Sequence, residues 1–336
     1  MDWIEALLIP FVKVLFFIFA LLGAGAYMTL FERKVCSRFQ VRYGPNRAGP
    51  FGIFQPLADA IKAFFKEEIV PNTVDKLTYL IAPGISLAAV LITFGVVPVG
   101  PSINLFGYEV SLQIADVNVG ALYLLAVAGL GTYGIVLGGW SSNNKYSLLG
   151  AFRTTAQLIS YELPLGLALA SVVLIAGSLS LKDIVQFQGW VPLVVLQPIG
   201  FLIYLICGLA ENNRSPFDLP ETENELVSGF ATEYGGIKFA IFFIAEYTNM
   251  VVVSSILATL YLGGWRWPAF LADIHPVVAV ALFGVKVLFF LYLFVWIRAS
   301  LPRVRYDKLM RFSWKFLFPL SLVNLAATAV VVSLVA

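Results

Sequence analysis

Cysteine and histidine are nearly missing from this sequence, and their scarcity limits the chemistry that the chain can perform alone. The 336 residues include two cysteines and one histidine. An iron–sulfur cluster is held by four thiolates, a structural zinc ion by four cysteine or histidine ligands, and a bis-histidine haem by two histidines. No G-x-G-x-x-G stretch follows a strand pattern, and no Walker loop is present. We therefore expect this chain to bind no redox metal, nucleotide or flavin by itself.

Charged residues are also scarce. Only 12% of the residues are charged and 60% are hydrophobic, and the mean hydropathy is +0.87, whereas about a quarter of the residues in soluble domains are charged. The apolar runs are continuous and long enough to cross a bilayer of about 30 Å as helices of about 20 residues. They lack the alternation with period two that marks transmembrane barrels. We therefore predict an all-α integral membrane protein.

Eight apolar segments are long enough to span a membrane, and turn or charge signals separate them. They predict a bundle of about eight transmembrane helices, which forms a single polytopic domain over residues 1–336 without a separate soluble domain. Pro83 and Pro164 are expected in the first turns of the second and fourth helices, where proline is tolerated. The expected helices cover about 8–31, 77–97, 119–139, 158–177, 191–210, 238–262, 276–298 and 314–335.

The basic residues predict the orientation of the bundle. The loops after the first, third, fifth and seventh segments contain fifteen lysines and arginines, whereas the opposite loops contain only Lys182 and Arg266. By the positive-inside rule, the basic loops face the cytoplasm or a mitochondrial matrix. Of these two settings we expect the plasma membrane of a bacterium, with both termini on the outer side.

The loop after the first segment contains a stretch of different character. Apolar residues recur at spacings of three and four along one helical face of residues 54–64, and polar residues follow the same period on another face. The pattern predicts an amphipathic helix at about 53–67, which lies in the plane of the membrane interface. Two interpretations remain open: the helix anchors the loop, or it roofs the entrance of a site for an amphipathic ligand. The polar face comprises Gln55, Asp59, Lys62 and Lys66.

A cytoplasmic loop at about 211–237 holds nearly a third of the 20 acidic residues of the chain. Pro216 and Pro220 prevent a regular helix through its first part. Like charges and desolvation both raise carboxylate pKa values, so we expect some of these groups to hold protons near neutral pH. A solvated acidic loop is the alternative, although its phenylalanine, leucine and tyrosine residues favour packing. The loop contains Glu211, Arg214, Asp218, Glu221, Glu223, Glu225 and Glu233.

Four charged residues fall within the apolar segments or at their ends. Glu162 stands at the start of the fourth segment and Glu211 at the end of the fifth, while Glu246 lies within the sixth and Lys286 near the middle of the seventh. Inserting such a group into a bilayer costs at least about 2.5–3.5 kcal/mol, so it usually faces a polar interior and marks an ion or proton path. A structural ion pair between Lys286 and Glu246 is the alternative. These charges indicate proton or cation handling, coupled to a reaction that other chains supply.

Two stretches resemble the signature sequences of a known family. GIFQPLADAIKAFFKE (52–67) and PFDLPETENELVSG (216–229) are similar to those of the quinone-site membrane subunit of proton-pumping NADH:quinone oxidoreductase, respiratory complex I. This family is called the H subunit in bacteria and subunit 1 in mitochondria. The resemblance covers nearly the whole chain. It implies a subunit between the peripheral and membrane arms that forms the lower part of a quinone chamber and begins a polar axis toward the antiporter-like subunits.

The resemblance also implies roles for individual residues and partners. It implies that quinone is the substrate, that flavin mononucleotide and iron–sulfur clusters are held by partner subunits, and that the chain is inactive alone. The expected partners are peripheral iron–sulfur and quinone-site subunits, small membrane subunits of the proton path, quinone and the lipid bilayer, but not nucleic acid. Glu246 and Lys286 are intramembrane candidates from the pattern. The implied quinone-binding residues are Arg33, Asp59, Lys62 and Arg214, and the implied proton-coupling residues are Glu162, Glu211, Asp218, Glu221, Glu223 and Glu225.

Two positions depart from the family pattern, and three other interpretations stay open. Thr222 stands where the acidic loop of the family usually has a small alanine or glycine. Some relatives carry a glutamate in the third segment where this chain has Gly129, so either that carboxylate is dispensable or water or a neighbouring subunit replaces it. The other interpretations are the membrane subunit of a related energy-converting hydrogenase, a stand-alone cation transporter and a passive anchor. The lack of inverted repeats argues against a transporter. The insertion cost of the charges argues against an anchor.

Overall fold

Long apolar helices account for most of the molecule, as the sequence predicts. The computed structural model describes residues 8–105, 108–218, 227–272 and 275–335. Within these residues, seven helical stretches are long and apolar enough to cross a membrane, which confirms an all-α membrane protein. They are α1 (Ile9–Phe39), α3 (Lys76–Phe94), α4 (Gly120–Ser141), α5 (Lys145–Ala176), α10 (Gly236–Tyr261), α12 (Pro276–Ser300), and a last stretch formed by α13 (Tyr306–Phe312), a π-helical turn (Ser313–Leu317) and α14 (Phe318–Val335).

The fifth expected span is not a single long helix. It divides into α7 (Leu193–Leu196) and α8 (Pro198–Glu211), because Pro198 has no N–H to continue the α7 hydrogen-bond ladder. A helix of 14 residues is about 21 Å long, which is shorter than the hydrocarbon core of a bilayer. The described residues therefore contain seven long helices and one short apolar helix instead of eight spans of similar length.

The fourth expected span begins much earlier than its hydropathy indicates. Asn144 caps α5 by accepting a hydrogen bond from Tyr146 N at 2.9 Å, so the helix includes the polar stretch before the apolar run. Pro164 therefore lies deep inside α5, and Pro83 is likewise inside α3. The expectation that both prolines occupy first turns is wrong. Glu162, predicted to open its segment, lies near the middle of α5 instead.

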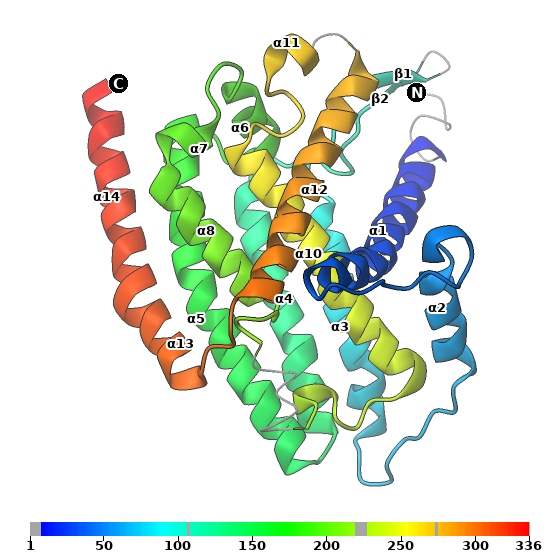
Figure 1. The fold of residues 1–336 in the computed structure, drawn as a ribbon. Coiled ribbons are helices and arrows are strands. Elements are labelled where there is room, and N and C mark those ends of the chain that lie inside the picture. Colours follow the sequence, from blue (N-terminus) through cyan, green and yellow to red (C-terminus); the bar gives the residue numbers. More distant parts are fainter. Residues whose placement is uncertain (1–7, 106–107, 219–226, 273–274, 336) are drawn as a thin grey trace.

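The two termini lie at the same end of the bundle (Figure 1). We call this end, which holds the start of α1 and the end of α14, the termini end. It also holds the antiparallel strands β1 (Ile103–Leu105) and β2 (Tyr108–Val110), and the short helices α6 (Leu181–Phe187), α7 and α11 (Ala269–Ala272). The location of both termini at one end agrees with the predicted orientation. The side of the membrane that they face remains a prediction.

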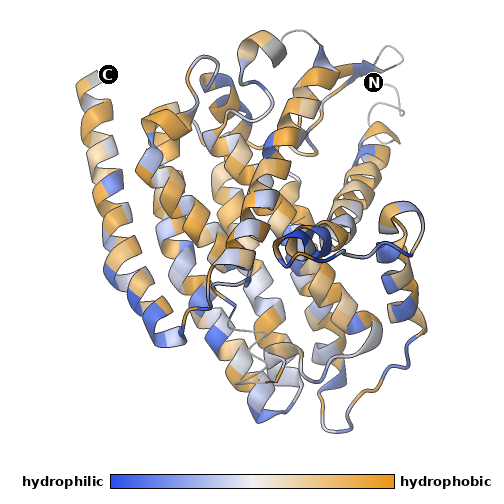
Figure 2. Ribbon diagram, viewed as in Figure 1, coloured by the Kyte–Doolittle hydropathy of each residue, from blue (hydrophilic) through white to orange (hydrophobic). Residues whose placement is uncertain are grey.

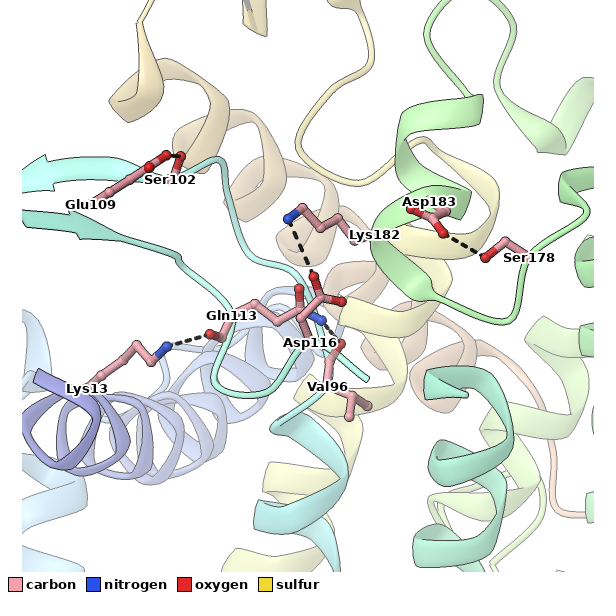
Figure 3. Close-up of polar contacts among 9 residues, drawn as sticks. All are labelled: Lys13, Val96, Ser102, Glu109, Gln113, Asp116, Ser178, Lys182 and Asp183. Atoms are coloured by element: carbon pink, nitrogen blue, oxygen red, sulfur yellow. Dashed lines mark hydrogen bonds and ion pairs between the residues drawn. The ribbon is translucent and has the colours of Figure 1, made fainter. Parts of the chain in front are cut away.

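Polar contacts join the loops of the termini end to the helices (Figure 3). Lys13 of α1 donates a hydrogen bond to Gln113 O at 2.8 Å, and the Gln113 side chain donates to Val96 O at 2.9 Å. Lys182 of α6 lies 3.4 Å from Asp116. The connection between α3 and α4 is thus fixed to α1 and α6.

Helix α10 lies at the centre of the bundle, and α14 lies at its edge. Two thirds of the apolar window of α10 is buried, against 17% for the last helical stretch. The α10 helix contacts α1, α3, α8 and α12, whereas α14 contacts α5 and α8. Figure 2 shows hydrophobic residues along the long helices, and hydrophilic residues at the C-terminal end of α1, on α2 and around α13.

The amphipathic stretch forms a helix of its own beside the bundle. Helix α2 (Gln55–Phe65) begins after a 3₁₀ turn at Pro50–Gly52 and contains no buried residue. It contacts α1 and α10 (Figure 1). The helix falls within the predicted limits of 53–67, and its location in the membrane interface remains a prediction.

Candidate functional site

Three carboxyl groups from three helices line one cavity inside the bundle. Glu162 of α5, Glu211 of α8 and Glu246 of α10 border a cavity with about 800 Å³ of empty space, part of which is open. Small residues of α3 and α4, including Ala89 and Gly129, also line it. Other polar residues on its lining are Ser86, Thr93, Thr132, Asn212, Asn213 and Asn249. The sequence could not show that these three acids share a cavity, because they are far apart along the chain.

The same carboxyl groups border two further spaces. Glu162, Glu211 and Asn249 line a smaller cavity of about 370 Å³, which reaches Tyr204 of α8 and Ile256 of α10. Glu162 also lines a groove of about 830 Å³ on the face of α4 and α5. Glu162 therefore borders both the interior of the bundle and the α4–α5 face.

Gly129 leaves room for the Glu162 carboxylate. A Cβ atom built on Gly129 would lie 3.0 Å from Glu162 Oε1, which is closer than an ordinary van der Waals contact. Gly129 lines both the large cavity and the α4–α5 groove. Gly129, where we expected some relatives to carry a glutamate, therefore lies directly against Glu162, and a larger residue would displace the Glu162 carboxylate.

A buried arginine lies beside this cavity. The Arg214 side chain is 4% exposed, and its Nη2 atom lies 3.6 Å from Glu246 Oε2. The guanidinium also covers the ring of Tyr247, with its central carbon 4.2 Å from the ring centroid, and lies 5.4 Å from the centroid of Phe243. A carboxylate and the faces of two aromatic rings together stabilise a guanidinium that has lost its hydration. Arg214 thus links the loop after α8 to helix α10.

Gln157 fixes the loop that carries Arg214. Its fully buried side chain donates hydrogen bonds to Ala210 O at 2.7 Å and Phe217 O at 2.8 Å. The Phe217 ring packs against Tyr161 of α5 at a centroid distance of 5.7 Å. These two hydrogen bonds hold residues 210–217 against α5. The half-buried Asp218 directly follows Phe217 in the chain. Sequence analysis missed Gln157, because a single amide within a helical stretch gives no distinctive signal.

The remainder of the acidic loop can be placed only in part. Glu221, Glu223 and Glu225 lie outside the described residues. Glu233 is described, and it accepts a hydrogen bond from Asn144 Nδ2 at 2.6 Å, away from the cavity. Next to it, Tyr234 stacks on Tyr79 with centroids 4.2 Å apart, and burial raises the pKa of Tyr234 to about 12. Tyr234 is therefore a neutral hydrogen-bond donor at physiological pH.

The candidate quinone-binding residues of the first loop form a separate group. Arg33 of α1 and Asp59 of α2 form an ion pair at 2.8 Å, and Gln55 also donates to Asp59 at 3.0 Å. Lys62 is exposed on α2. None of the three candidates, Arg33, Asp59 and Lys62, lines the cavity of the carboxyl groups. The ion pair fixes α2 against α1 at the edge of the bundle.

Lys286 and Glu246 do not form the ion pair considered as an alternative. Glu246 faces Arg214, whereas Lys286 Nζ donates hydrogen bonds to three backbone carbonyls of the loop after α10. Glu246 stands 15 residues before Tyr261, the last residue of α10, which corresponds to about 22 Å along the helix. Lys286 is therefore remote from the cavity of the carboxyl groups.

Two further ion pairs were not predicted. Arg298 of α12 contacts Glu32 of α1, whose side chain is 8% exposed. Lys238 of α10 lies 2.9 Å from Glu68 in the loop after α2. Both acids were visible in the sequence, but nothing there identified their partners. Among the described residues, no group of three or more His, Cys, Asp or Glu side chains is arranged to hold a metal ion.

Comparison with known proteins gives a consistent result over the whole length of the chain. A family profile described as NADH dehydrogenase matches residues 12–329. A protein of Geobacter sulfurreducens that is named as an H subunit of NADH-quinone oxidoreductase is 52% identical over 332 residues, which cover 95% of this chain and 93% of the relative. The protein of the same name from Thermomicrobium roseum is 50% identical over 343 residues, with 98% of both chains covered.

Proposed function

The chain belongs to the H-subunit family of NADH-quinone oxidoreductase and is a membrane subunit of respiratory complex I, and we propose that its cavity of carboxyl groups couples quinone reduction to proton translocation. The observation that carries this proposal is the meeting of Glu162, Glu211 and Glu246 at one cavity beside Arg214. Carboxyl groups that border one cavity interact electrostatically, so their protonation is coupled. A coupled set of this kind responds as a unit when the charge nearby changes.

Quinone reduction supplies such a change of charge. A quinone that takes up two electrons must also take up two protons, or else it leaves an anionic quinol in an environment of low dielectric constant. In our proposal, the acidic residues Glu221, Glu223 and Glu225 respond to this reaction by changing their protonation. Arg214 and Asp218 then change partners, and the change reaches Glu211 and Glu162. The Arg214–Glu246 contact supports this order of events, because it joins the acidic loop to α10.

The proposal also assigns a direction to the path. Glu246 faces Arg214 on the side of the acidic loop, while Glu162 borders the α4–α5 groove. We propose that the protonation change passes from the acidic loop to Glu246, which faces Arg214, and leaves through Glu162, toward a neighbouring membrane subunit on the α4–α5 face. Gly129 supports this route, since a larger residue would approach the Glu162 carboxylate.

The entrance for quinone is proposed at the edge formed by α1, α2 and α10. Helix α2 presents exposed apolar side chains, including Leu57, Ile61 and Phe64, and it lies against α1 and α10. The isoprenoid chain of a quinone favours contact with such an apolar surface. The polar head of the quinone favours contact with the Arg33–Asp59 ion pair and with exposed Lys62. The amphipathic helix thus serves as the roof of the entrance, in addition to any anchoring role.

The proposed assembly follows from membership of the complex. Flavin mononucleotide and the iron–sulfur clusters are held by peripheral subunits, and small membrane subunits continue the proton path. The chain is a multi-pass bacterial membrane protein, and we propose that its termini lie on the outer side. Neither the hydrogenase nor the transporter interpretation gains support, since the matching proteins are named as subunits of NADH-quinone oxidoreductase.

The first test is purification of the tagged chain with its native partners after gentle extraction from the membrane. We expect the purified material to contain flavin and iron–sulfur clusters and to reduce a short-chain quinone with NADH. A complex that holds clusters but ignores NADH would indicate another electron donor or the hydrogenase interpretation. A lone chain without cofactors would contradict the proposal and favour a transporter.

A further inference from the structure

Lys286 has a complete set of partners that the proton path does not use. Its Nζ atom lies 2.7 Å from Leu262 O, 2.6 Å from Gly264 O and 2.5 Å from Trp267 O. An ammonium group has three N–H donors and no acceptor, so the number of carbonyl partners equals the number of donors. The ring of Trp267 lies on a further side, 5.6 Å from Nζ, which is within the range of a cation–π contact.

The loop after α10 has backbone carbonyl groups that require hydrogen-bond donors. Leu262 ends the helix, and Gly263 and Gly264 continue the chain with φ angles of 67° and 50°, which glycine adopts without strain. Lys286 stands ten residues into α12, which begins at Pro276, and therefore about 15 Å along the helix. The loop therefore lies beside an inner turn of α12, and its two glycines are buried, so the carbonyls of this irregular backbone need partners within the protein.

A second side chain also donates hydrogen bonds to carbonyl groups at the C-terminal end of α10. The Gln188 side chain, which is fully buried, donates to Thr259 O and Leu260 O, both at 3.1 Å. Together, Gln188 and Lys286 occupy five carbonyl groups at the C-terminal end of α10 and in the following loop. Helix C-terminal ends leave carbonyls without partners inside the helix and favour a positive charge. Lys286 supplies both the donors and the charge.

We propose that the carbonyls of Leu262, Gly264 and Trp267 form an internal site for a primary ammonium group, which the side chain of Lys286 fills permanently. This site closes the end of α10 that lies nearest the termini end. Lys286 is then a fixed structural cation and takes no part in carrying protons. The proposal is independent of the proton path described above, because the site is remote from Glu162, Glu211 and Glu246.

The test uses the assembled complex with Lys286→Ala. Truncation at Cβ removes the equivalent of n-propylammonium, so this small cation fits the space that the variant opens. We expect Lys286→Ala to lower the midpoint temperature of the complex, and millimolar n-propylammonium to restore most of the loss. Tetramethylammonium, which has the charge but no N–H donor, should restore none of it. Lys315→Ala, which removes an exposed lysine of the last helical stretch, is the matched control and should respond to neither cation.

An unchanged midpoint for Lys286→Ala would overturn the proposal, and so would equal effects of the two cations. If Lys286→Ala does not assemble, Lys286→Arg and Lys286→Met take its place. The arginine variant keeps charge and donors and is expected to assemble in larger amounts than the methionine variant; equal amounts would contradict the site. Lys286→Arg should also keep the wild-type number of protons moved per electron, and loss of that ratio in an assembled complex would assign Lys286 to the proton path instead.

Discussion

Arg214 and Glu246 meet inside the bundle, with Nη2 of the arginine 3.6 Å from Oε2 of the glutamate. The contact joins the loop after α8, which continues into the acidic segment, to the central helix α10. The rings of Tyr247 and Phe243 lie on the same guanidinium. A change of charge in the acidic segment can therefore act on α10 and on its cavity through one residue.

Replacing Arg214 by methionine tests this contact. Removing one partner of a buried ion pair typically costs about 3–5 kcal/mol, because the other charge remains buried without compensation. We expect Arg214→Met to lower the midpoint temperature of the complex and to reduce NADH-driven quinone reduction. The double variant Arg214→Met with Glu246→Gln should recover part of the stability, because it leaves no uncompensated charge. Strictly additive effects of the two substitutions would show that the residues do not interact.

The ion pair between Arg33 and Asp59 is expected to affect the substrate more than stability. Its side chains are 47% and 37% exposed, and exposed ion pairs contribute only about 0–1 kcal/mol. Asp59→Asn should therefore assemble normally but raise the KM for a long-chain quinone, because the entrance formed by α1 and α2 loses its fixed geometry. The matched control is Asp116→Asn, which breaks the similarly exposed pair with Lys182 at the termini end. An equal KM for both variants and the wild type would remove Asp59 from the entrance.

Gly129 offers a test of the route through Glu162. In Gly129→Ala the new methyl group would lie 3.0 Å from Glu162 Oε1, whereas in Gly131→Ala it would meet Ala89 Cβ at an ordinary 3.7 Å. We expect Gly129→Ala to reduce the number of protons moved per electron and Gly131→Ala to leave it unchanged. Both variants should keep quinone reduction, since the atoms nearest the new methyl groups belong to Glu162 and Ala89 and not to Arg214. If the two alanine variants translocate protons equally well, the space beside Glu162 is not part of the path.

Hydropathy and periodicity predicted the helices well, but not where each helix begins. The apolar run of the fourth segment suggested a start near residue 158, whereas the Asn144 cap starts α5 at Lys145. Ser147, Thr154 and Gln157 in this polar stretch are buried, and their contacts are invisible in the sequence. In the fifth segment, the hydropathy average concealed the break that Pro198 imposes. The helix content was therefore predictable, while boundaries depended on tertiary contacts.

The candidate site was predictable residue by residue, but its pairings were not. The insertion cost of charges identified Glu162, Glu211 and Glu246 without any structure. The rotation of each helix about its axis decides which of these acids share a cavity and which cation faces Glu246. The polar residues of these helices follow no regular period, so this rotation could not be predicted from the sequence. The alternative of a pair between Lys286 and Glu246 failed for this reason, since Lys286 turns toward the carbonyls beyond α10.

The most direct test of the coupling proposal is the number of protons translocated per two electrons by the complex with Glu211→Gln, reconstituted into sealed vesicles. Glu109→Gln, which alters an exposed acid of the β1–β2 hairpin, is the control and should match the wild type. Because Glu211 joins the two interior cavities, we predict a lower proton-to-electron ratio, with quinone reduction slowed but still measurable. If Glu211→Gln leaves both the ratio and the turnover unchanged, the cavity of carboxyl groups does not couple the two processes.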